Sequence, residues 1–196
     1  MIVAFVQARM SSTRLPGKVM LPIAGRPMLW HLWRRLSQAR ILDKVVVATG
    51  DVPSNEPIVK FCDENDVLCF QGPEDDVVGR VYQAALAYKA DTIVAITGDC
   101  PLIDPQITDH VVHEYQLYKP DLCATSPSLT YPDGFGTDVF SIEALSKANA
   151  EAQVAMEREH LTLFFRRHQD QFKFRFVENE SYHPAIDLHL SVDDEH

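Results

Sequence analysis

The 196-residue sequence has no long apolar run and only four cysteines. None of its hydrophobic stretches approaches the length of a membrane span, and the run at 2–6 is too short for a signal peptide and has no basic leader. These absences argue against a membrane protein. The cysteines, which show neither C-x-x-C spacing nor paired histidines, are Cys62, Cys69, Cys100 and Cys123. We therefore expect reduced thiols in a cytoplasmic protein.

Acidic residues are absent from the first 42 positions. The net charge of −10 argues against general nucleic-acid binding, yet this segment holds seven basic residues, Arg9, Arg14, Lys18, Arg26, Arg34, Arg35 and Arg40. The rest of the chain carries 11 basic and 28 acidic residues. One wholly basic segment in an acidic protein predicts a local anion site. The alternative is that the first three of these residues are only solvated loop charges.

No repeat, low-complexity tract or linker divides the chain, so we expect a single domain, 1–196. Apolar runs typical of strands occupy 2–6, 44–49, 67–70, 92–97, 121–125, 137–140 and 172–177, with a strand-like run at 189–192. Helical spacing occupies about 27–39, 56–65, 75–89, 104–118, 142–150 and 157–168. This alternation predicts an α/β fold, a doubly wound, mostly parallel Rossmann-like sheet with helices on both faces. Because such a domain usually covers a final strand with another helix, we expect the chain to lack its C-terminal segment.

The polar residues that follow two of these strands predict a nucleotide site. Ligands of open α/β sheets bind at the carboxyl ends of strands, where the strand order reverses. If the order begins third, second, first, fourth, a basic loop after the first strand faces Asp99 after the fourth. That loop carries Arg9, Ser11, Ser12, Thr13, Arg14 and Lys18. Cations for phosphates and a carboxylate for a metal suit a magnesium–triphosphate. The glycines of a Walker P-loop or a G-x-G-x-x-G fingerprint are missing.

Residues 7–18, QARMSSTRLPGK, resemble the A-R-x-x-S-x-R-L-P-x-K signature of the sugar-acid cytidylyltransferases. These are the CMP-Kdo and CMP-acylneuraminate synthetases, and the spore-coat-polysaccharide branch is the most similar. The resemblance extends over nearly the whole chain, through GRPM (25–28), VAT (47–49), TGDCPLID (97–104), YPDGF (131–135), REH (158–160) and SVD (191–193). It implies a fold of the nucleotide-diphospho-sugar transferase type, CTP and a sugar as substrates, Mg²⁺ as cofactor and a homodimer.

The resemblance also implies roles for matching residues. It assigns the triphosphate to Arg9 and Lys18, which with Asp99 are the catalytic candidates, and the base to the backbone at Ala8–Arg9 and the region of Thr97. Ser11 and Arg14 complete the nucleotide set. Magnesium would be held by Asp99 and Asp193, although the late V-D-x-x-E-D pattern is matched only in part by 192–196. The sugar candidates are Tyr131, Asp133, Glu159 and His160.

Structural roles remain open for several of these candidates. Asp99 could cap the turn before Pro101, Cys100 is expected to pack as a small residue, and Glu159 and His160 could form surface pairs on their helix. The turn at 131–135 could be purely structural. Since the Kdo enzymes commonly have an acidic residue at position 100, the sugar need not be Kdo.

The reaction that the resemblance implies is attack of a sugar hydroxyl on the α-phosphorus of CTP, with release of pyrophosphate. Two alternatives remain at this point. A nucleotide-sugar glycosyltransferase would share the fold but should carry a D-x-D motif, where this chain has one carboxylate, Asp99. A non-catalytic nucleotide-binding relative would keep the basic loop without turnover. The residues do not identify the sugar, since such specificity lies in variable loops.

Overall fold

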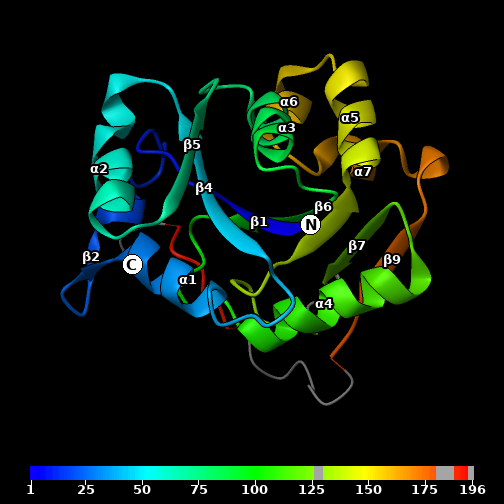
Figure 1. The fold of residues 1–196 in the computed structure, drawn as a ribbon, viewed down its shortest axis with the longest axis horizontal. Coiled ribbons are helices and arrows are strands. Elements are labelled where there is room, and N and C mark those ends of the chain that lie inside the picture. Colours follow the sequence, from blue (N-terminus) through cyan, green and yellow to red (C-terminus); the bar gives the residue numbers. More distant parts are fainter. Residues whose placement is uncertain (126–129, 180–187, 194–196) are drawn as a thin grey trace.

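The computed structural model describes residues 1–125, 130–179 and 188–193. Within them, seven strands form one sheet in the order β5-β4-β1-β6-β8-β7-β9 (Figure 1). The strands are β1 (Ile2–Gln7), β4 (Lys44–Gly50), β5 (Leu68–Gly72), β6 (Thr92–Thr97), β7 (Leu122–Thr125), β8 (Asp138–Ser141) and β9 (Phe174–Val177). Only β8 runs antiparallel to its neighbours, β6 and β7. The mostly parallel sheet and the expected order of the first four strands are confirmed.

Helices cover both faces of the sheet (Figure 1). One face carries α1 (Met28–Leu36), α2 (Glu56–Glu64) and α4 (Pro105–Tyr118), and the other carries α3 (Val77–Ala87), α5 (Ile142–Glu151), α6 (Ala155–Glu159) and α7 (Leu163–Arg167). Short 3₁₀ turns lie at η1 (Lys18–Met20), η2 (Pro53–Asn55) and η3 (Gln169–Gln171). A two-stranded ladder, β2 (Pro22–Ile23) with β3 (Arg26–Pro27), precedes α1. No helix in the described ranges is long and apolar enough to cross a membrane.

The strand β1 is apolar without interruption because both of its faces are buried. Val3 and Phe5 pack under α3 and α5, whereas Ala4 and Val6 pack under α1 and α4 on the opposite face. All four side chains are fully buried. A strand with helices on both sides has no solvent-facing residues, so alternation disappears from its sequence. The carboxyl end of β1 is therefore fixed rigidly at the middle of the sheet.

Polar caps fix where the helices that flank the site begin. The carboxylate of Asp76 accepts the Gly79 N–H at 2.8 Å ahead of α3, and that of Asp104 accepts the Gln106 N–H at 2.7 Å ahead of α4. The expected helices at 75–89 and 104–118 are confirmed, with α3 shorter at both ends. The first helix ends at Leu36 rather than near residue 39.

Two expected elements are wrong. The single helix at 157–168 is split into α6 and α7, because His160 is extended and Leu161, which is 3% exposed, turns into the core. The strand at 189–192 is not a strand: His189 makes one isolated bridge to Asp133. Residues 194–196, which complete the late acidic pattern, lie outside the described residues.

Candidate functional site

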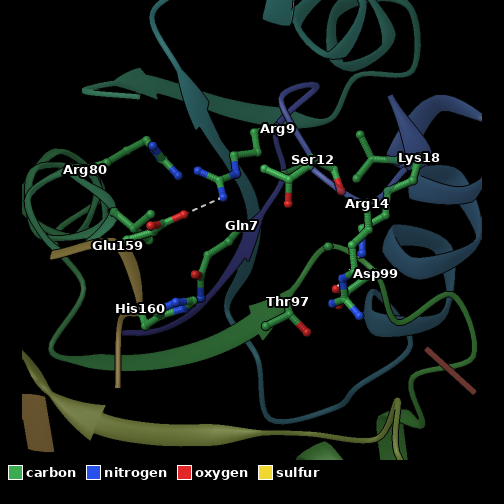
Figure 2. Close-up of a pocket in the computed structure, with 15 residues that line it drawn as sticks. Gln7, Arg9, Ser12, Arg14, Lys18, Arg80, Thr97, Asp99, Glu159 and His160 are labelled. Carbon is green, nitrogen blue, oxygen red and sulfur yellow. Dashed lines mark hydrogen bonds and ion pairs between the residues drawn. The ribbon is translucent and has the colours of Figure 1, made fainter. Parts of the chain in front are cut away.

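A cavity of about 420 Å³ opens at the carboxyl ends of β1 and β6, where the strand order reverses (Figure 2). Its walls come from the loop after β1, the end of β6, the first turn of α3, and the end of α6. The two central strands approach closely here: a Cβ at Gly98 would collide with the backbone carbonyl of Gln7. The volume is in the range of small-ligand pockets.

Lys18 lies at one end of this cavity. Lys18 follows Gly17, which has a left-handed conformation (φ 72°), and is the first residue of the turn η1. Its side chain is 11% exposed. Its Nζ donates to Oδ2 of Asp99 at 2.9 Å and to the carbonyl of Val192 at 2.7 Å, and lies 3.4 Å from Oδ1 of Asp193. A single ammonium thus joins the first loop, the end of β6 and the last described segment of the chain.

The environment of Asp99 keeps it ionised at neutral pH. Burial alone would raise its pKa, but hydrogen bonds from Lys18 and Thr97 outweigh burial and leave the pKa below its ordinary value. Burial and the charge of Asp99 raise the pKa of the neighbouring Cys100 thiol to about 12. A thiol that stays protonated is a poor nucleophile, and Cys100, 4% exposed, packs as a small residue.

The other cations of the loop are paired as well. Arg9 donates to Glu159 at 2.6 Å, and this bond holds the pKa of that carboxyl below its ordinary value. Arg14 donates to Asp193 at 2.6 Å. Arg9, Arg14 and Lys18 therefore each meet an acid from a distant part of the chain, although only Lys18 is buried and the Arg14 side chain is 65% exposed. Glu159 and His160 line the cavity from the end of α6.

The loop backbone is anchored at Met10, whereas the N–H groups of the next four residues have no partner among the described residues. Asn55 accepts the Met10 N–H at 2.9 Å, and its amide donates to Gly50 and Glu74. By contrast, the backbone N–H groups of residues 11–14 donate no hydrogen bond to another described residue. Successive free N–H groups on a fixed loop suit the oxygens of a phosphate chain.

Four of the sequence-based candidates lie outside the lining of the cavity. Ser11 donates to Glu74, and Asp193 reaches the cavity only through its pairs with Lys18 and Arg14. Asp133 anchors the segment 188–193: its carbonyl accepts the Leu190 N–H at 2.9 Å and its carboxylate accepts the Ser191 hydroxyl at 2.5 Å. Tyr131 is half-buried, and burial raises its pKa. Ala8, Arg9, Arg14, Lys18, Thr97 and Asp99 all line the cavity.

Arg80 is a lining residue that the sequence reasoning missed. It lies on α3 and is 1% exposed, the largest fully buried side chain in the described residues. Its Nη1 donates to the carbonyls of Pro73 at 2.5 Å and Glu74 at 2.8 Å. The available signal was a single cation among the apolar residues of a core helix, since a buried charge needs a specific reason.

The chain is similar to known proteins over nearly its whole length. The family model described as cytidylyltransferase matches residues 3–195. The chain is 29% identical to the spore coat polysaccharide biosynthesis protein SpsF of Bacillus subtilis (strain 168), over 98% of this chain and 81% of that protein.

Among the solved structures that share the fold, two are the most relevant. One is a cytidylyltransferase from Leptospira borgpetersenii serovar Hardjo-bovis, with a TM-score of 0.91 and 31% identity over 98% of this chain and 81% of that one. The other is a CMP:2-keto-3-deoxy-manno-octonic acid synthetase complexed with CTP, with a TM-score of 0.71 and 19% identity over 98% and 93% of the two chains. At 19% identity, the similarity to the synthetase shows only that the two chains share a fold.

Proposed function

From the premise that this chain belongs to the cytidylyltransferase family and is a nucleotidyltransferase, we propose that it transfers CMP from CTP to an acidic sugar and releases pyrophosphate. The observation that carries the proposal is the placement of Lys18 against Asp99 beside the basic loop, in one cavity at the switch point of the sheet. The CTP in the 2-keto-3-deoxy-manno-octonic acid synthetase of the same fold supports the choice of nucleotide.

The residues of this end of the cavity fit a magnesium ion that is shared with a triphosphate. Lys18 already places one cation against both Asp99 and Asp193, so the two carboxylates face a common position. The described residues contain no group of three or more His, Cys, Asp or Glu side chains that could hold a metal ion. Mg²⁺ typically binds one or two carboxylates and takes its other ligands from phosphates and water. We assign the ion to Asp99 and Asp193.

The chain's own residues would act mainly by alignment and by charge. Arg9, Arg14 and Lys18 bind the phosphates, together with the free backbone N–H groups of residues 11–14, and Lys18 stabilises the negative charge that grows on the leaving pyrophosphate. When bound, Mg²⁺ supplies Lewis-acid stabilisation of phosphate charge. The sugar hydroxyl then attacks the α-phosphorus, its new P–O bond replacing the bond to pyrophosphate, and its proton passes to solvent.

The acceptor would enter beside α6. Glu159 and His160 line the cavity there and offer a carboxylate and an imidazole to sugar hydroxyls. The turn with Tyr131 and Asp133 would act from outside the cavity, by holding the segment that carries Asp193. The similarity to a spore coat polysaccharide biosynthesis protein supports a role in polysaccharide synthesis. We therefore include in the proposal that the CMP-sugar product is used to build a surface polysaccharide.

The experiment is a pyrophosphate-release assay with each of CTP, UTP, ATP and GTP, with Mg²⁺ or EDTA, against a panel of neutral sugars and sugar acids. We expect release only with CTP, Mg²⁺ and an acidic sugar. Binding specific to UTP in a thermal-shift assay, without pyrophosphate release, would favour a glycosyltransferase, because glycosyl transfer from a nucleotide-sugar releases a nucleoside diphosphate. Pyrophosphate release specific to UTP would contradict the choice of CTP. CTP binding in a thermal-shift assay, without pyrophosphate release from any sugar, would favour a non-catalytic nucleotide-binding protein.

A further inference from the structure

Asn55 stands at the start of α2 but does not cap that helix. It is the last residue of η2 and directly precedes α2, and its side chain makes no hydrogen bond to the first turn. Asparagine is favoured at this position because its oxygen usually accepts a free N–H group of the helix. The side chain is nevertheless 0% exposed. Contacts elsewhere in the fold must therefore account for its burial.

The buried amide of Asn55 has three partners from three parts of the chain. Its Oδ1 accepts the Met10 N–H at 2.9 Å, in the loop after β1. Its Nδ2 donates to the Gly50 carbonyl at 3.1 Å, at the end of β4, and to Oε2 of Glu74 at 2.7 Å, ahead of α3. Because both ends of the amide are bonded, its orientation is fixed. Asn55 thus ties the basic loop to the end of the neighbouring strand.

Glu74 holds the same loop a second time. One carboxylate oxygen accepts from Asn55, and the other accepts the hydroxyl of Ser11 at 2.5 Å. Gly50 leaves room for this carboxylate, since a Cβ there would lie 1.6 Å from Oε2 of Glu74 and 2.8 Å from Nδ2 of Asn55. The backbone of Gly50 is not left-handed, so the need for glycine comes from this space alone.

The loop closes at Met10, the residue that Asn55 holds. The N–H of Met10 goes to Asn55, and its carbonyl accepts the Gly17 N–H at 2.9 Å. Lys18 follows directly and reaches the cavity, as Figure 2 shows. The free N–H groups of residues 11–14 and the ammonium of Lys18 are therefore carried by a loop whose two ends meet at Met10.

We propose that Asn55 is a positioning residue of the phosphate site, which acts through Met10 to set the direction of the N–H groups of residues 11–14. This inference rests on the function proposed above. Asn55 itself does not line the cavity, so it acts through the loop backbone and not by touching the nucleotide. Donors that are aligned before a phosphate chain arrives need no ordering when it binds, and this raises affinity.

The first test exchanges the two polar groups of the Asn55–Glu74 pair, with calorimetric titration of CTP and inorganic tripolyphosphate. Asn55→Asp keeps the acceptor for Met10 but sets two carboxylates against each other. We expect both affinities to fall about tenfold and by the same factor, since the loop would contact only phosphates. Adding Glu74→Gln lets an amide donate to the carboxylate again, while its oxygen still accepts from Ser11. Most of the lost affinity should then return.

Asn65→Asp, at the other end of α2, is the matched control. Asn65 also donates its amide to a carbonyl, that of Phe61 at 2.8 Å, and it does not line the cavity. This variant should keep the wild-type affinity for tripolyphosphate. A folded Asn55→Asp protein with wild-type affinity overturns the inference. An equal loss in Asn65→Asp overturns it too, because the effect would then come from general stability.

A second measurement uses only the wild type and so stands even if Asn55→Asp does not fold. Amide hydrogen exchange is followed by NMR with and without tripolyphosphate. We expect the Met10 amide to be protected in both states, and the amides of residues 11–14 to become protected only when tripolyphosphate is added. A Met10 amide that exchanges as fast as these four in the free protein overturns the inference. A wild type that binds neither CTP nor tripolyphosphate overturns the proposed function itself.

Discussion

The ammonium of Lys18 lies 2.9 Å from the carboxylate of Asp99, although the two residues are 81 positions apart in the sequence. They meet because β1 and β6 are parallel neighbours, in register from Ile2 opposite Thr92 to Gln7 opposite Thr97. The loops that leave these strands therefore start side by side. Since the pair sits between the basic loop and the segment that carries Asp193, it is the most informative place to perturb the site.

Replacing Lys18 by Met should lower the rate of pyrophosphate release from CTP. The aliphatic stem is kept while the charge on the phosphates is lost, and one charge-assisted contact corresponds to roughly ten- to a hundredfold in rate. The control is Lys60→Met, at an exposed position on α2 where the lysine pairs with Glu64, and it should keep full activity. Unchanged turnover in Lys18→Met would remove Lys18 from the mechanism.

The ionised carboxylate of Asp99 should contribute to the free energy of unfolding, and this contribution should be lost in acid. Its folded pKa is lowered, so its contribution is fully present above the ordinary aspartate pKa of about 3.9 and is lost as the pH falls through the folded value. Urea unfolding between pH 7 and pH 2 should therefore show a smaller acid loss for Asp99→Asn than for the wild type. Asp75→Asn, at an exposed position before α3, should keep the wild-type profile. Identical pH profiles of unfolding free energy for all three proteins would show that the Lys18–Asp99 pair does not stabilise the fold.

Glu159→Gln should raise the KM for the sugar about tenfold and leave CTP binding nearly unchanged. The amide oxygen of glutamine can still accept from Arg9, which keeps that cation in place, but the charge offered to sugar hydroxyls is gone. Steady-state kinetics with the sugar varied, beside CTP titrations, separates the two effects. Glu151→Gln, exposed at the end of α5, serves as the control. A weakened CTP affinity with an unchanged sugar KM would assign Glu159 to the nucleotide.

The sequence was sufficient for the family and for the centre of the fold. The motif at 7–18 resembled cytidylyltransferases, and this family is confirmed. Buried parallel strands such as β1 and β6 show as continuous apolar runs, so their order and the loops that follow them could be inferred. These are local signals, carried by neighbouring residues.

The rest of the site depends on distant contacts that no local pattern records. The break between α6 and α7 places His160 at the cavity, yet the apolar spacing around it reads as one helix. Arg80 looks like an ordinary helical arginine until the cavity beside it is known. The run at 189–192 looked like a strand, but its position is set by Asp133 and Lys18 rather than by a sheet neighbour.

The position of the segment 188–193 depends on Gly134, in the turn that it packs against. Gly134 has φ +100°, a conformation that L side chains rarely adopt, and a Cβ there would lie 2.7 Å from the carbonyl carbon of Leu190. Gly134→Ala should therefore push residues 188–193 away from the turn. The carbonyl of Val192 and the carboxylate of Asp193 would then leave Lys18.

We expect Gly134→Ala to lose about tenfold or more in pyrophosphate release, because the second carboxylate assigned to Mg²⁺ is displaced. Its melting temperature should also fall, since an alanine at φ +100° is strained, but the protein should stay folded because neither buried cluster of the sheet includes this turn. The matched control is Gly136→Ala, two residues on, where a Cβ would meet nothing within 4 Å. If Gly134→Ala keeps wild-type activity and wild-type Mg²⁺ dependence, Asp193 does not hold the metal, and the ion must rely on Asp99 and the triphosphate.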